Sequence, residues 1–184
     1  MTQSKPTSIQ IVISLFAVIT LLEVINLVSG RMLNQFAILP RETSHLSGIV
    51  ISPFLHGSLW HYLSNIVPVC LFSYFLLQWG KPRYFTVSAF IIVVTGLLVW
   101  LLGRSAFHLG ASGLIYGYFG FLLVAGFLSK KPRLILISIV VGFFYGGMIF
   151  GVLPLKSFIS WESHLFGLLS GFAAAMIWAK PEKQ

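Results

Sequence analysis

A serine between residues with almost no side chain is the first candidate for chemistry in this chain. Ser112 lies in the tetrapeptide Gly110-Ala111-Ser112-Gly113, where nothing bulky covers its hydroxyl and glycine lets the backbone turn sharply. Ser112 is therefore a candidate nucleophile. The alternative is a patch of small residues that packs helices together, which is the more common use of such a group in an apolar sequence. Partner residues elsewhere in the chain must decide between the two.

Few side chains are available as partners for this serine. Aspartate is absent, which excludes an aspartyl dyad, and the carboxylates are Glu23, Glu42, Glu162 and Glu182. Five scattered histidines and the single Cys70 do not form a metal-ligand pattern, so we expect neither a metal nor a cofactor. The remaining chemistry is nucleophilic attack by serine with a histidine as the base.

His164 is the best candidate for that base. Glycines follow both candidates at helical spacing: Gly113, Gly117 and Gly120 after Ser112, and Gly167 and Gly171 after His164. Two glycine-lined faces let two helices approach closely, which would bring the imidazole to the Ser112 hydroxyl. Tyr116, one turn after Ser112, could pack against that imidazole and orient it.

His61 and Asn65 are four residues apart and share one face of a helix. Both can donate hydrogen bonds to a developing oxyanion. The backbone amide of Ser112 is a third candidate donor if Ser112 begins a helix, because the first amides of a helix have no partner inside it. Hydrogen bonding between membrane helices is the alternative role for His61 and Asn65.

Composition indicates that these residues lie in a membrane. Apolar residues make up 57% of the chain and charged residues 9%, far from the balance of soluble domains. A spanning helix needs about 20 apolar residues. Six runs are long enough: 9–29, 58–79, 84–102, 112–128, 133–153 and 161–179. These runs take up most of residues 1–184, which we therefore expect to form one domain. We therefore predict an all-α, polytopic bundle of six transmembrane helices.

The fourth run is short for a bilayer. Residues 112–128 would make a helix about 26 Å long, against a hydrocarbon core of about 30 Å, so Ser112 should lie below the membrane surface. The preceding loop must then dip into the membrane, which requires surrounding protein or a water-filled cavity. The segment 30–55 is also too apolar for a free tether and should fold as a half-embedded outer loop.

Charge placement predicts the orientation of the chain. Both termini share a side with eight of the 12 basic residues: Lys5, Lys81, Arg83, Lys130, Lys131, Arg133, Lys180 and Lys183. The opposite side has Arg31, Arg41, Arg104 and Lys156. The positive-inside rule therefore places the termini in the cytoplasm, and the pattern fits a bacterial inner (plasma) membrane. We expect contact with anionic lipid headgroups and no binding of nucleic acid.

Two carboxylates need an explanation within this arrangement. Glu23 lies inside the first run, where an ionisable group is costly unless it is paired or faces water. A structural hydrogen-bonding role is the simpler interpretation, and a role in catalysis or ion passage is the alternative. Glu162 is two residues from His164 and so points to another face of the helix. We interpret it as a favourable charge in the first turn, and a role in orienting His164 is the alternative.

Together, three motifs in this order resemble those of the rhomboid intramembrane serine proteases, particularly the bacterial GlpG type. They are His56-x-Ser-x-x-His61-x-x-x-Asn65, Gly110-Ala111-Ser112-Gly113 with Tyr116, and His164-x-x-Gly167-x-x-x-Gly171. The resemblance covers nearly the whole chain. It implies a six-helix fold in which Ser112 is the nucleophile and His164 the general base and acid, with no cofactor. His61, Asn65 and the Ser112 amide would form the oxyanion hole, and His56 and the motif glycines would support the site.

The resemblance also implies roles for the outer segments. Residues 30–55 would be the half-embedded first loop, and residues 154–160 a flexible cap over the site. Phe143, Phe144 and Tyr145 would lie near a lateral entrance for substrate. The chain departs from the family pattern in two places. Ser47-Gly48 lies where a Trp-Arg pair is usual, which leaves the anchoring of the first loop open, and Ser163 replaces an alanine.

The expected function is cleavage of transmembrane segments of membrane proteins near the outer face, by a Ser-His dyad. Two alternatives come from other classes. One is a catalytically inactive rhomboid-like binding protein. The other is a small transporter or channel, although the six runs show no repeated halves and have few ionisable groups inside them.

Overall fold

The structure is a computed structural model, and it describes residues 6–155 and 159–180. Lys5, Lys156, Glu182 and Lys183, for which the sequence suggested positions, lie outside the described residues, as does the middle of the expected cap at 154–160. The described residues form helices and one isolated β-bridge, between Ile38 and His108. The prediction of an all-α polytopic bundle is confirmed.

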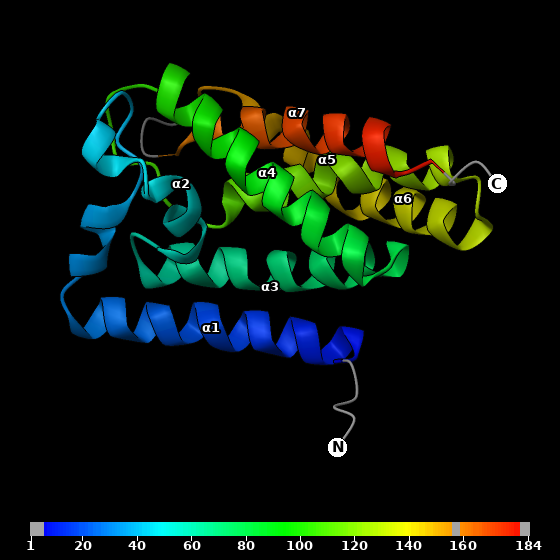
Figure 1. Ribbon diagram of the computed structural model, residues 1–184, viewed down its shortest axis with the longest axis horizontal. Coiled ribbons are helices and arrows are strands. Elements are labelled where there is room, and N and C mark those ends of the chain that lie inside the picture. Colours follow the sequence, from blue (N-terminus) through cyan, green and yellow to red (C-terminus); the bar gives the residue numbers. More distant parts are fainter. Residues whose placement is uncertain (1–5, 156–158, 181–184) are drawn as a thin grey trace.

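Six long helices occupy the six predicted places and run side by side (Figure 1). They are α1 (Ser8–Val28), α3 (Leu59–Leu76) extended by η4 (Leu77–Trp79), α4 (Lys81–Leu102), α5 (Ser112–Ser129), α6 (Pro132–Tyr145) extended by η5 (Gly146–Val152), and α7 (Trp161–Trp178). Between α1 and α3 are four short elements: η1 (Met32–Phe36), η2 (Thr43–His45), α2 (Gly48–Ile51) and η3 (Ser52–Phe54). The start of α1 and the end of α7 lie at the same end of the bundle (Figure 1).

Local signals in the sequence explain where the helices begin and end. Thr7 and Gln10 form a capping box at the start of α1, and the Ser58 side chain caps α3 by accepting from the His61 amide. Pro132 occupies the first position of α6, where its missing N–H removes no hydrogen bond. Lys130 ends α5 in the left-handed conformation.

Five of the described helices are long and apolar enough to cross a membrane, namely α1, α3 with η4, α4, α5, and α6 with η5. The sixth predicted run, α7, is not among them. It has 18 residues, as α5 has, but Glu162 and His164 lie in its first turn. Both side chains are buried against protein, so α7 can lie within the bundle without presenting these groups to lipid.

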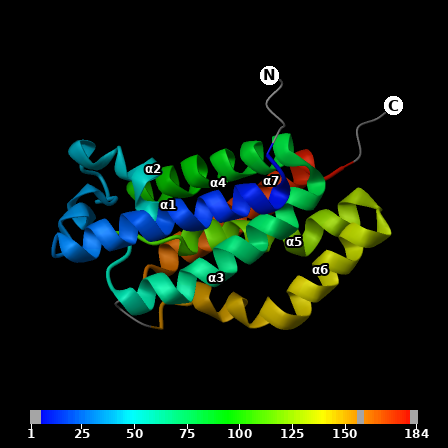
Figure 2. The same cartoon turned by 90° about the horizontal axis from the view of Figure 1, so that it is seen from below.

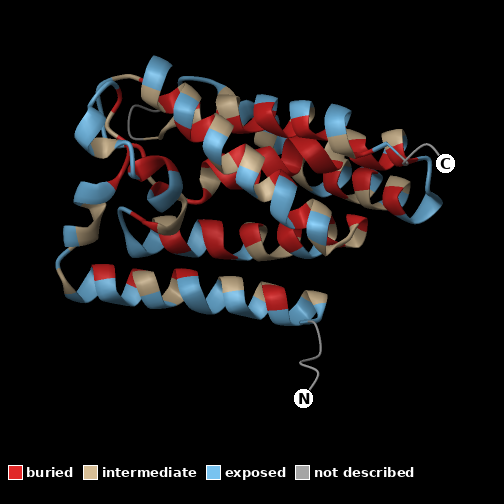
Figure 3. Cartoon of the chain, viewed as in Figure 1, coloured by how far each residue is buried: buried red, intermediate tan, exposed pale blue. Residues whose placement is uncertain are grey.

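Helix α5 is the centre of the bundle. Of its apolar window 72% is buried, against 11–39% for the other four membrane-spanning candidates. Buried residues gather on the middle helices, whereas α1 is largely exposed at the edge (Figure 3). Helix α6 lies on the flank, away from α1 and α4 (Figure 2). With 18 residues, α5 is about 27 Å long and remains shorter than a bilayer core of about 30 Å.

Glycines bring α5 and α7 together, as the sequence predicts. A Cβ on Gly167 would collide with the Gly113 carbonyl oxygen, and one on Gly171 would collide with the Gly117 carbonyl oxygen. A Cβ on Gly120 would lie 2.5 Å from the carbonyl oxygen of Leu168. The two backbones are therefore in direct contact, and larger residues at these positions would part the helices.

The expected role of Gly117 is wrong in one respect. Its open side faces α4, where a Cβ would collide with the Ile91 side chain, and only its carbonyl faces α7. A substitution at Gly117 would therefore press first on α4. Gly113 likewise points between α4 and α7, because a Cβ there would lie 3.3 Å from Thr95 and 3.4 Å from the Ser163 carbonyl oxygen.

The segment between α1 and α3 is anchored without the Trp-Arg pair. A Cβ on Gly48 would lie 2.5 Å from the backbone nitrogen of Ile38, so this part of the loop packs backbone against backbone. Ser52 makes two further contacts. Its hydroxyl accepts from the Ile38 amide at 2.9 Å, and its carbonyl accepts from the Gly110 amide at 2.9 Å. The second bond ties this segment directly to the loop that carries the candidate nucleophile.

Candidate active site

Ser112 is the first residue of α5. Its side chain is half-buried, and no side chain caps this end of the helix. Within the described residues, the Ser112 amide makes no hydrogen bond. An unpaired amide at the positive end of a helix can donate to an anion, so the predicted backbone donor is free for that role.

The His164 ring is fixed by two contacts. Its Nδ1 lies 2.8 Å from the carbonyl oxygen of Gly151, and its face stacks on Tyr116 with ring centroids 4.1 Å apart and an interplanar angle of 8°. The Tyr116 hydroxyl in turn donates to the Met148 carbonyl at 2.9 Å. Because a carbonyl only accepts, Nδ1 carries the hydrogen and Nε2 has the free lone pair. This tautomer is the one that a general base needs.

Gly151 is a site residue that sequence reasoning missed. A Cβ at this position would collide with the Tyr116 hydroxyl, so a larger residue would push the tyrosine away from its place against the imidazole. Its contribution is a backbone carbonyl, and a carbonyl leaves no mark in a sequence. The run of glycines at 146, 147 and 151 was the available signal.

The packing of α5 and α7 brings the two candidates to the same level of the bundle. Gly113 follows Ser112 and contacts the Ser163 backbone, which precedes His164. Within the described residues, no hydrogen bond joins the Ser112 hydroxyl to the imidazole. Hydrogen bonds between a nucleophile and its base are often long or misaligned without substrate. The dyad therefore stays a prediction that the helix packing favours.

His61 presents a donor to the nucleophile loop. The Gly57 amide donates to its Nδ1 at 3.4 Å, so the hydrogen of the neutral ring is on Nε2. That Nε2 lies against Gly110, where a Cβ would be 2.6 Å away. Gly110 has φ +112°, so glycine is required there both for its backbone conformation and for the space that His61 occupies.

Asn65 is placed differently from the expectation. Its amide nitrogen donates to the His61 carbonyl at 2.7 Å, within the same helix, and its Oδ1 is buried without a partner among the described residues. A rotation of the side chain would be needed to direct a donor at an oxyanion. The role of Asn65 in the oxyanion hole remains a prediction.

His56 supports His61 from behind. Its ring is fully buried and meets the His61 ring edge-on, with centroids 5.2 Å apart. Burial, with the charges of His61 and Arg31 adding, lowers the pKa of His56 to about 3. The ring is therefore neutral, and neither of its nitrogens has a hydrogen-bond partner in the described part of the chain.

The backbone of His56 is held by a network that begins at Glu23. Glu23 is 3% exposed and pairs with Arg31 at 2.8 Å. The carbonyl of His56 accepts from Asn26 at 3.2 Å, Arg31 at 3.0 Å and Asn34 at 3.3 Å. Glu23 thus has the structural role that the sequence favoured. Sequence reasoning missed Arg31, Asn26 and Asn34, although an arginine eight residues after a buried glutamate was a usable signal.

A second network joins the loop before Ser112 to the start of α7. Glu162 lies in the first turn of α7, as the sequence predicts, and it is also 3% exposed and pairs with the Arg104 guanidinium at 3.4 Å. His108 bridges the same two elements, with Nδ1 2.5 Å from the Ser160 hydroxyl and Nε2 3.0 Å from the Arg104 carbonyl. Burial lowers the pKa of His108, and the bond to the Arg104 carbonyl opposes this shift. Ser112 and His164 therefore sit on segments that are tied together.

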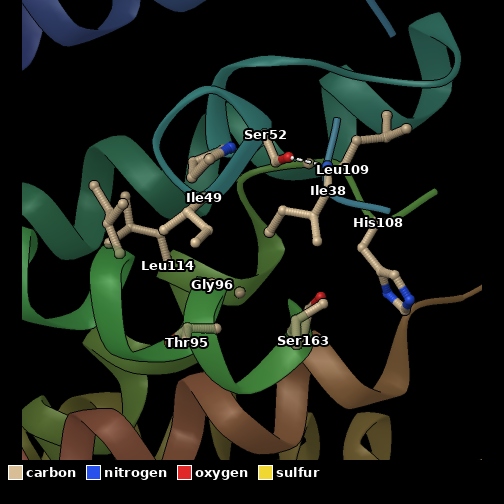
Figure 4. A pocket seen from close by; sticks show the side chains of 14 residues that line it. Ile38, Ile49, Ser52, Thr95, Gly96, His108, Leu109, Leu114 and Ser163 are labelled. Atoms are coloured by element: carbon tan, nitrogen blue, oxygen red, sulfur yellow. Dashed lines mark hydrogen bonds between the residues drawn. The ribbon is translucent and has the colours of Figure 1, made fainter. Parts of the chain in front are cut away.

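A small cavity adjoins the nucleophile loop. Its volume is about 30 Å³, enough for water but not for a peptide segment. Hydroxyl groups of Ser52, Thr95 and Ser163 lie around it, Ser52 on one side and the other two opposite (Figure 4). Gly110 and Gly113, which flank Ser112, also line it. Most of the remaining lining is apolar and Ser112 itself does not line this space, so the water-filled cavity that the sequence called for remains a prediction.

The far end of α6 lies beside α3. Phe143 and Phe144 are 81% and 72% exposed, whereas Tyr145 packs edge-on against Phe72 of α3, with centroids 4.9 Å apart. Past Tyr145, α6 continues as the glycine-rich η5, which supplies the Gly151 carbonyl to His164. A movement of this end of α6 would thus affect both the α3–α6 boundary and the candidate base.

Comparison with known proteins identifies the class to which this site belongs. The Rhomboid domain family matches residues 43–181, which include α3 to α7 and all three motifs. The chain belongs to the rhomboid family.

Relatives extend the match over nearly the whole chain. An uncharacterized protein of Mycobacterium tuberculosis is 34% identical over 182 residues, covering 94% of this chain and 76% of the relative. An uncharacterized protein of Mycobacterium leprae is 32% identical, covering 94% and 72%. A putative rhomboid protein of Acanthamoeba polyphaga mimivirus is 24% identical over 148 residues, covering 76% and 79%. The chain is therefore similar to uncharacterized mycobacterial proteins and to a viral putative rhomboid protein. Its five long apolar helices fit an integral, multi-pass membrane protein.

Proposed function

We propose that this protein is an intramembrane serine endopeptidase that cleaves transmembrane segments of membrane proteins. Membership of the rhomboid family supports the class. The observation that carries the proposal is the state of His164: the Gly151 carbonyl fixes the hydrogen on Nδ1, and stacking on Tyr116 fixes the ring. A histidine held in the tautomer of a base, on a helix packed against the one that starts with Ser112, has the arrangement that serine hydrolysis requires.

The reaction follows from these groups. The Ser112 oxygen attacks the peptide carbonyl carbon while Nε2 of His164 takes the hydroxyl proton. The tetrahedral intermediate collapses, the C–N bond breaks, and the imidazolium gives its proton to the leaving amine. Water, deprotonated by the same nitrogen, then attacks the acyl-enzyme. As the second intermediate collapses, the bond from the acyl carbon to the Ser112 oxygen breaks and the imidazolium returns its proton to that oxygen. The Gly151 carbonyl takes the orienting position that a carboxylate has in a triad.

Two donors would stabilise the oxyanion in this scheme. The Ser112 amide follows the Gly110 turn, and the Nε2 of His61, on α3, lies against Gly110. Each such donor contributes roughly 3 kcal/mol to stabilisation of the transition state. Asn65 would add a third after a side-chain rotation. His56 and the Glu23–Arg31 network would act by positioning His61.

The substrate would enter from the membrane. Exposed Phe143 and Phe144 beside α3 would flank the entrance, and the cap formed by residues 154–160 would cover the site. An intact helix hides its carbonyls in its own hydrogen bonds, so we expect cleavage where small or helix-breaking residues let the substrate unwind. The surplus of basic residues at the opposite end supports cytoplasmic termini in a bacterial inner membrane, with the site near the outer face.

Labelling with a fluorophosphonate, combined with cleavage of a transmembrane reporter, tests this function. Wild-type protein should be labelled and should cleave the reporter, and Ser112→Ala should do neither. His164→Ala should reduce both to background, because the serine loses its base. Ser44→Ala, which alters an exposed serine of η2 whose hydroxyl makes no hydrogen bond among the described residues, is the matched control and should retain both activities.

Other results of this experiment would support one of the alternative functions. Labelling that persists in Ser112→Ala would show that another residue reacts and would contradict the dyad. A folded wild-type protein that binds the reporter segment without labelling or cleavage would instead be an inactive rhomboid-like binding protein.

A further inference from the structure

A second cavity lies at the end of the bundle away from Ser112. It has a volume of about 210 Å³ and is formed where η4 ends, α4 begins, α5 passes into α6, and α7 ends. Its lining consists of Gln78, Trp79, Arg83, Ser129, Lys131, Arg133, Leu134 and Ala179. A water molecule takes about 30 Å³ of liquid, so this space can hold a ligand group larger than water.

Among the described residues, the charged side chains that line this cavity are all of one sign. Arg83, Lys131 and Arg133 line it, and none of them pairs with a carboxylate among the described residues. The Arg133 guanidinium donates to the neutral Gln78 amide oxygen at 2.5 Å. Three cations that converge on one space repel each other unless an anion lies between them. The lining therefore favours a negatively charged ligand.

Two further groups add to this preference. Trp79 is 9% exposed, and its indole N–H is buried without an acceptor in the part of the chain that the structure describes. The cavity also adjoins the first turns of two long helices, α4 at Lys81 and α6 at Pro132. The N-termini of helices carry partial positive charge and unpaired amides, and both features attract phosphate.

The position of the cavity points to the source of that phosphate. The cavity opens where four apolar helices reach the edge of the membrane, and Trp79, Leu134 and Ala179 give it an apolar wall. Tryptophan is enriched at the level of the headgroups, and basic pockets between membrane helices bind phospholipid headgroups. A free phosphate ion would use the cations but not the apolar wall. We propose that this cavity is a binding site for the phosphate headgroup of an anionic phospholipid.

Binding there has a structural consequence. The lining residues come from the ends or starts of α3 with η4, α4, α5, α6 and α7, so one headgroup would bridge helices that otherwise carry like charges at this end. A ligand that binds only the folded state raises stability with its concentration. The lipid would therefore stabilise the bundle independently of the chemistry at Ser112.

The test uses the full-length protein in a neutral detergent. Phosphatidylglycerol, phosphatidylcholine or inorganic phosphate is added in separate series, and thermal unfolding and native mass spectrometry report stability and retained lipid. Phosphatidylglycerol should raise the melting temperature and remain bound, and phosphatidylcholine should do neither. Arg83→Gln and Arg133→Gln should each weaken phosphatidylglycerol binding by about fivefold or more. Lys130→Gln removes a charge from the same α5–α6 turn but not from the cavity lining, and should leave binding unchanged.

Any one of the following results would overturn the proposal. These are equal stabilisation by phosphatidylglycerol and phosphatidylcholine, an equal loss of binding in Lys130→Gln, or binding of inorganic phosphate as tight as that of the lipid. If Arg133→Gln unfolds because it loses Gln78, then Lys131→Gln removes an exposed cation of the lining that makes no side-chain hydrogen bond among the described residues. Retention of full affinity in Lys131→Gln and Arg83→Gln would also overturn it.

Discussion

The two ends of the bundle use their cations in different ways. At the end with Ser112, each described arginine binds defined acceptors. Arg31 pairs with Glu23, and Arg104 pairs with Glu162. Arg41 has no carboxylate partner but donates to the Gly103 carbonyl at 2.7 Å and the Ser105 hydroxyl at 2.9 Å. These arginines hold the loops that surround the candidate site.

At the opposite end, the described cations have no carboxylate partner among residues 6–155 and 159–180. They are Lys81, Arg83, Lys130, Lys131, Arg133 and Lys180. Arg133 alone among them makes a side-chain hydrogen bond to another described residue. The contrast shows that a count of basic residues on each side predicts orientation but not role. Cations at the site end bind groups of the folded structure, whereas those at the other end have no carboxylate partner in the part of the chain that the structure describes.

Arg31 offers the largest test of this contrast. In Arg31→Gln, Glu23 would keep a buried charge without a partner, and the His56 carbonyl would lose one of its three donors. We expect a loss of about 3 kcal/mol of unfolding free energy, as for other buried pairs that lose one partner. Lys81→Gln, at the opposite end, should change it by less than about 0.5 kcal/mol in neutral detergent. Reversible unfolding by sodium dodecyl sulfate in mixed micelles measures both values.

The double variant Glu23→Gln with Arg31→Gln provides the control. It removes the unpaired charge and should recover part of the lost stability. Equal stability of Arg31→Gln and Lys81→Gln would mean that the two ends do not differ in this way.

Acidification should also act on the site end. The pKa of His56 in the folded protein is about 3, below the ordinary value of 6.5, so the unfolded chain takes up the proton first. This contribution to stability is complete above pH 6.5 and is lost as the pH falls from 6.5 towards 3. Between pH 7 and pH 5 we expect His56 to cost about 2 kcal/mol. His108, whose pKa is also lowered by burial, should act in the same direction.

The comparison of two variants isolates this effect in unfolding measurements at pH 7 and pH 5. His56→Asn should lose much of the pH dependence, although it will be less stable at pH 7. His45→Asn changes a half-buried histidine of the same segment and should keep the pH dependence. The same slope in both variants would assign the pH dependence to other groups.

Features that depend on the length and spacing of apolar residues and glycines could be predicted from the sequence. The six helices lie where length and apolar character predicted them, and the glycine contacts of α5 and α7 follow from helical spacing. The direction of Gly117 was not accessible, because spacing shows which residues share a face but not which neighbour that face meets. The sequence showed that α7 begins with the polar residues Glu162 and His164. It did not show that both side chains would be buried against protein, because burial depends on how the helices pack.

Features of the site were accessible where a side chain carries them. Ser112, His61 and His164 could be proposed because the small neighbours of one serine and the few histidines of the chain are visible in the sequence, and their catalytic roles remain predictions. Gly151 acts through its carbonyl and was missed for that reason. Arg104 and Glu162 are 58 positions apart, and the sequence does not show which charged residues pair across such a distance.

The Arg104–Glu162 pair has the smallest expected effect on unfolding free energy, and it tests whether cations at the two ends of the bundle differ in their interactions. Arg104 is 36% exposed at its side chain and the closest approach is 3.4 Å, so water screens much of the attraction. A double-mutant cycle of Arg104→Gln and Glu162→Gln should give a coupling of about 1 kcal/mol in unfolding free energy. The cycle of Arg83→Gln and Arg133→Gln, at the opposite end, should give no stabilising coupling in neutral detergent, because like charges gain nothing from each other.

The same double-mutant cycle, measured as kcat/KM in a cleavage assay, reports on the placement of the catalytic groups, which unfolding free energy does not. Arg104 holds the loop that leads to Ser112 against the helix that carries His164, so Arg104→Gln should lower kcat/KM through displacement of the two groups, by up to about 10²-fold. The Arg83 and Arg133 variants should leave kcat/KM within about twofold of wild type when no anionic lipid is present. If both pairs changed kcat/KM equally, the position of the site would depend on the whole bundle. If only Arg104 and Glu162 did so, the paired cations of the site end would be the elements that hold the nucleophile and the base in register.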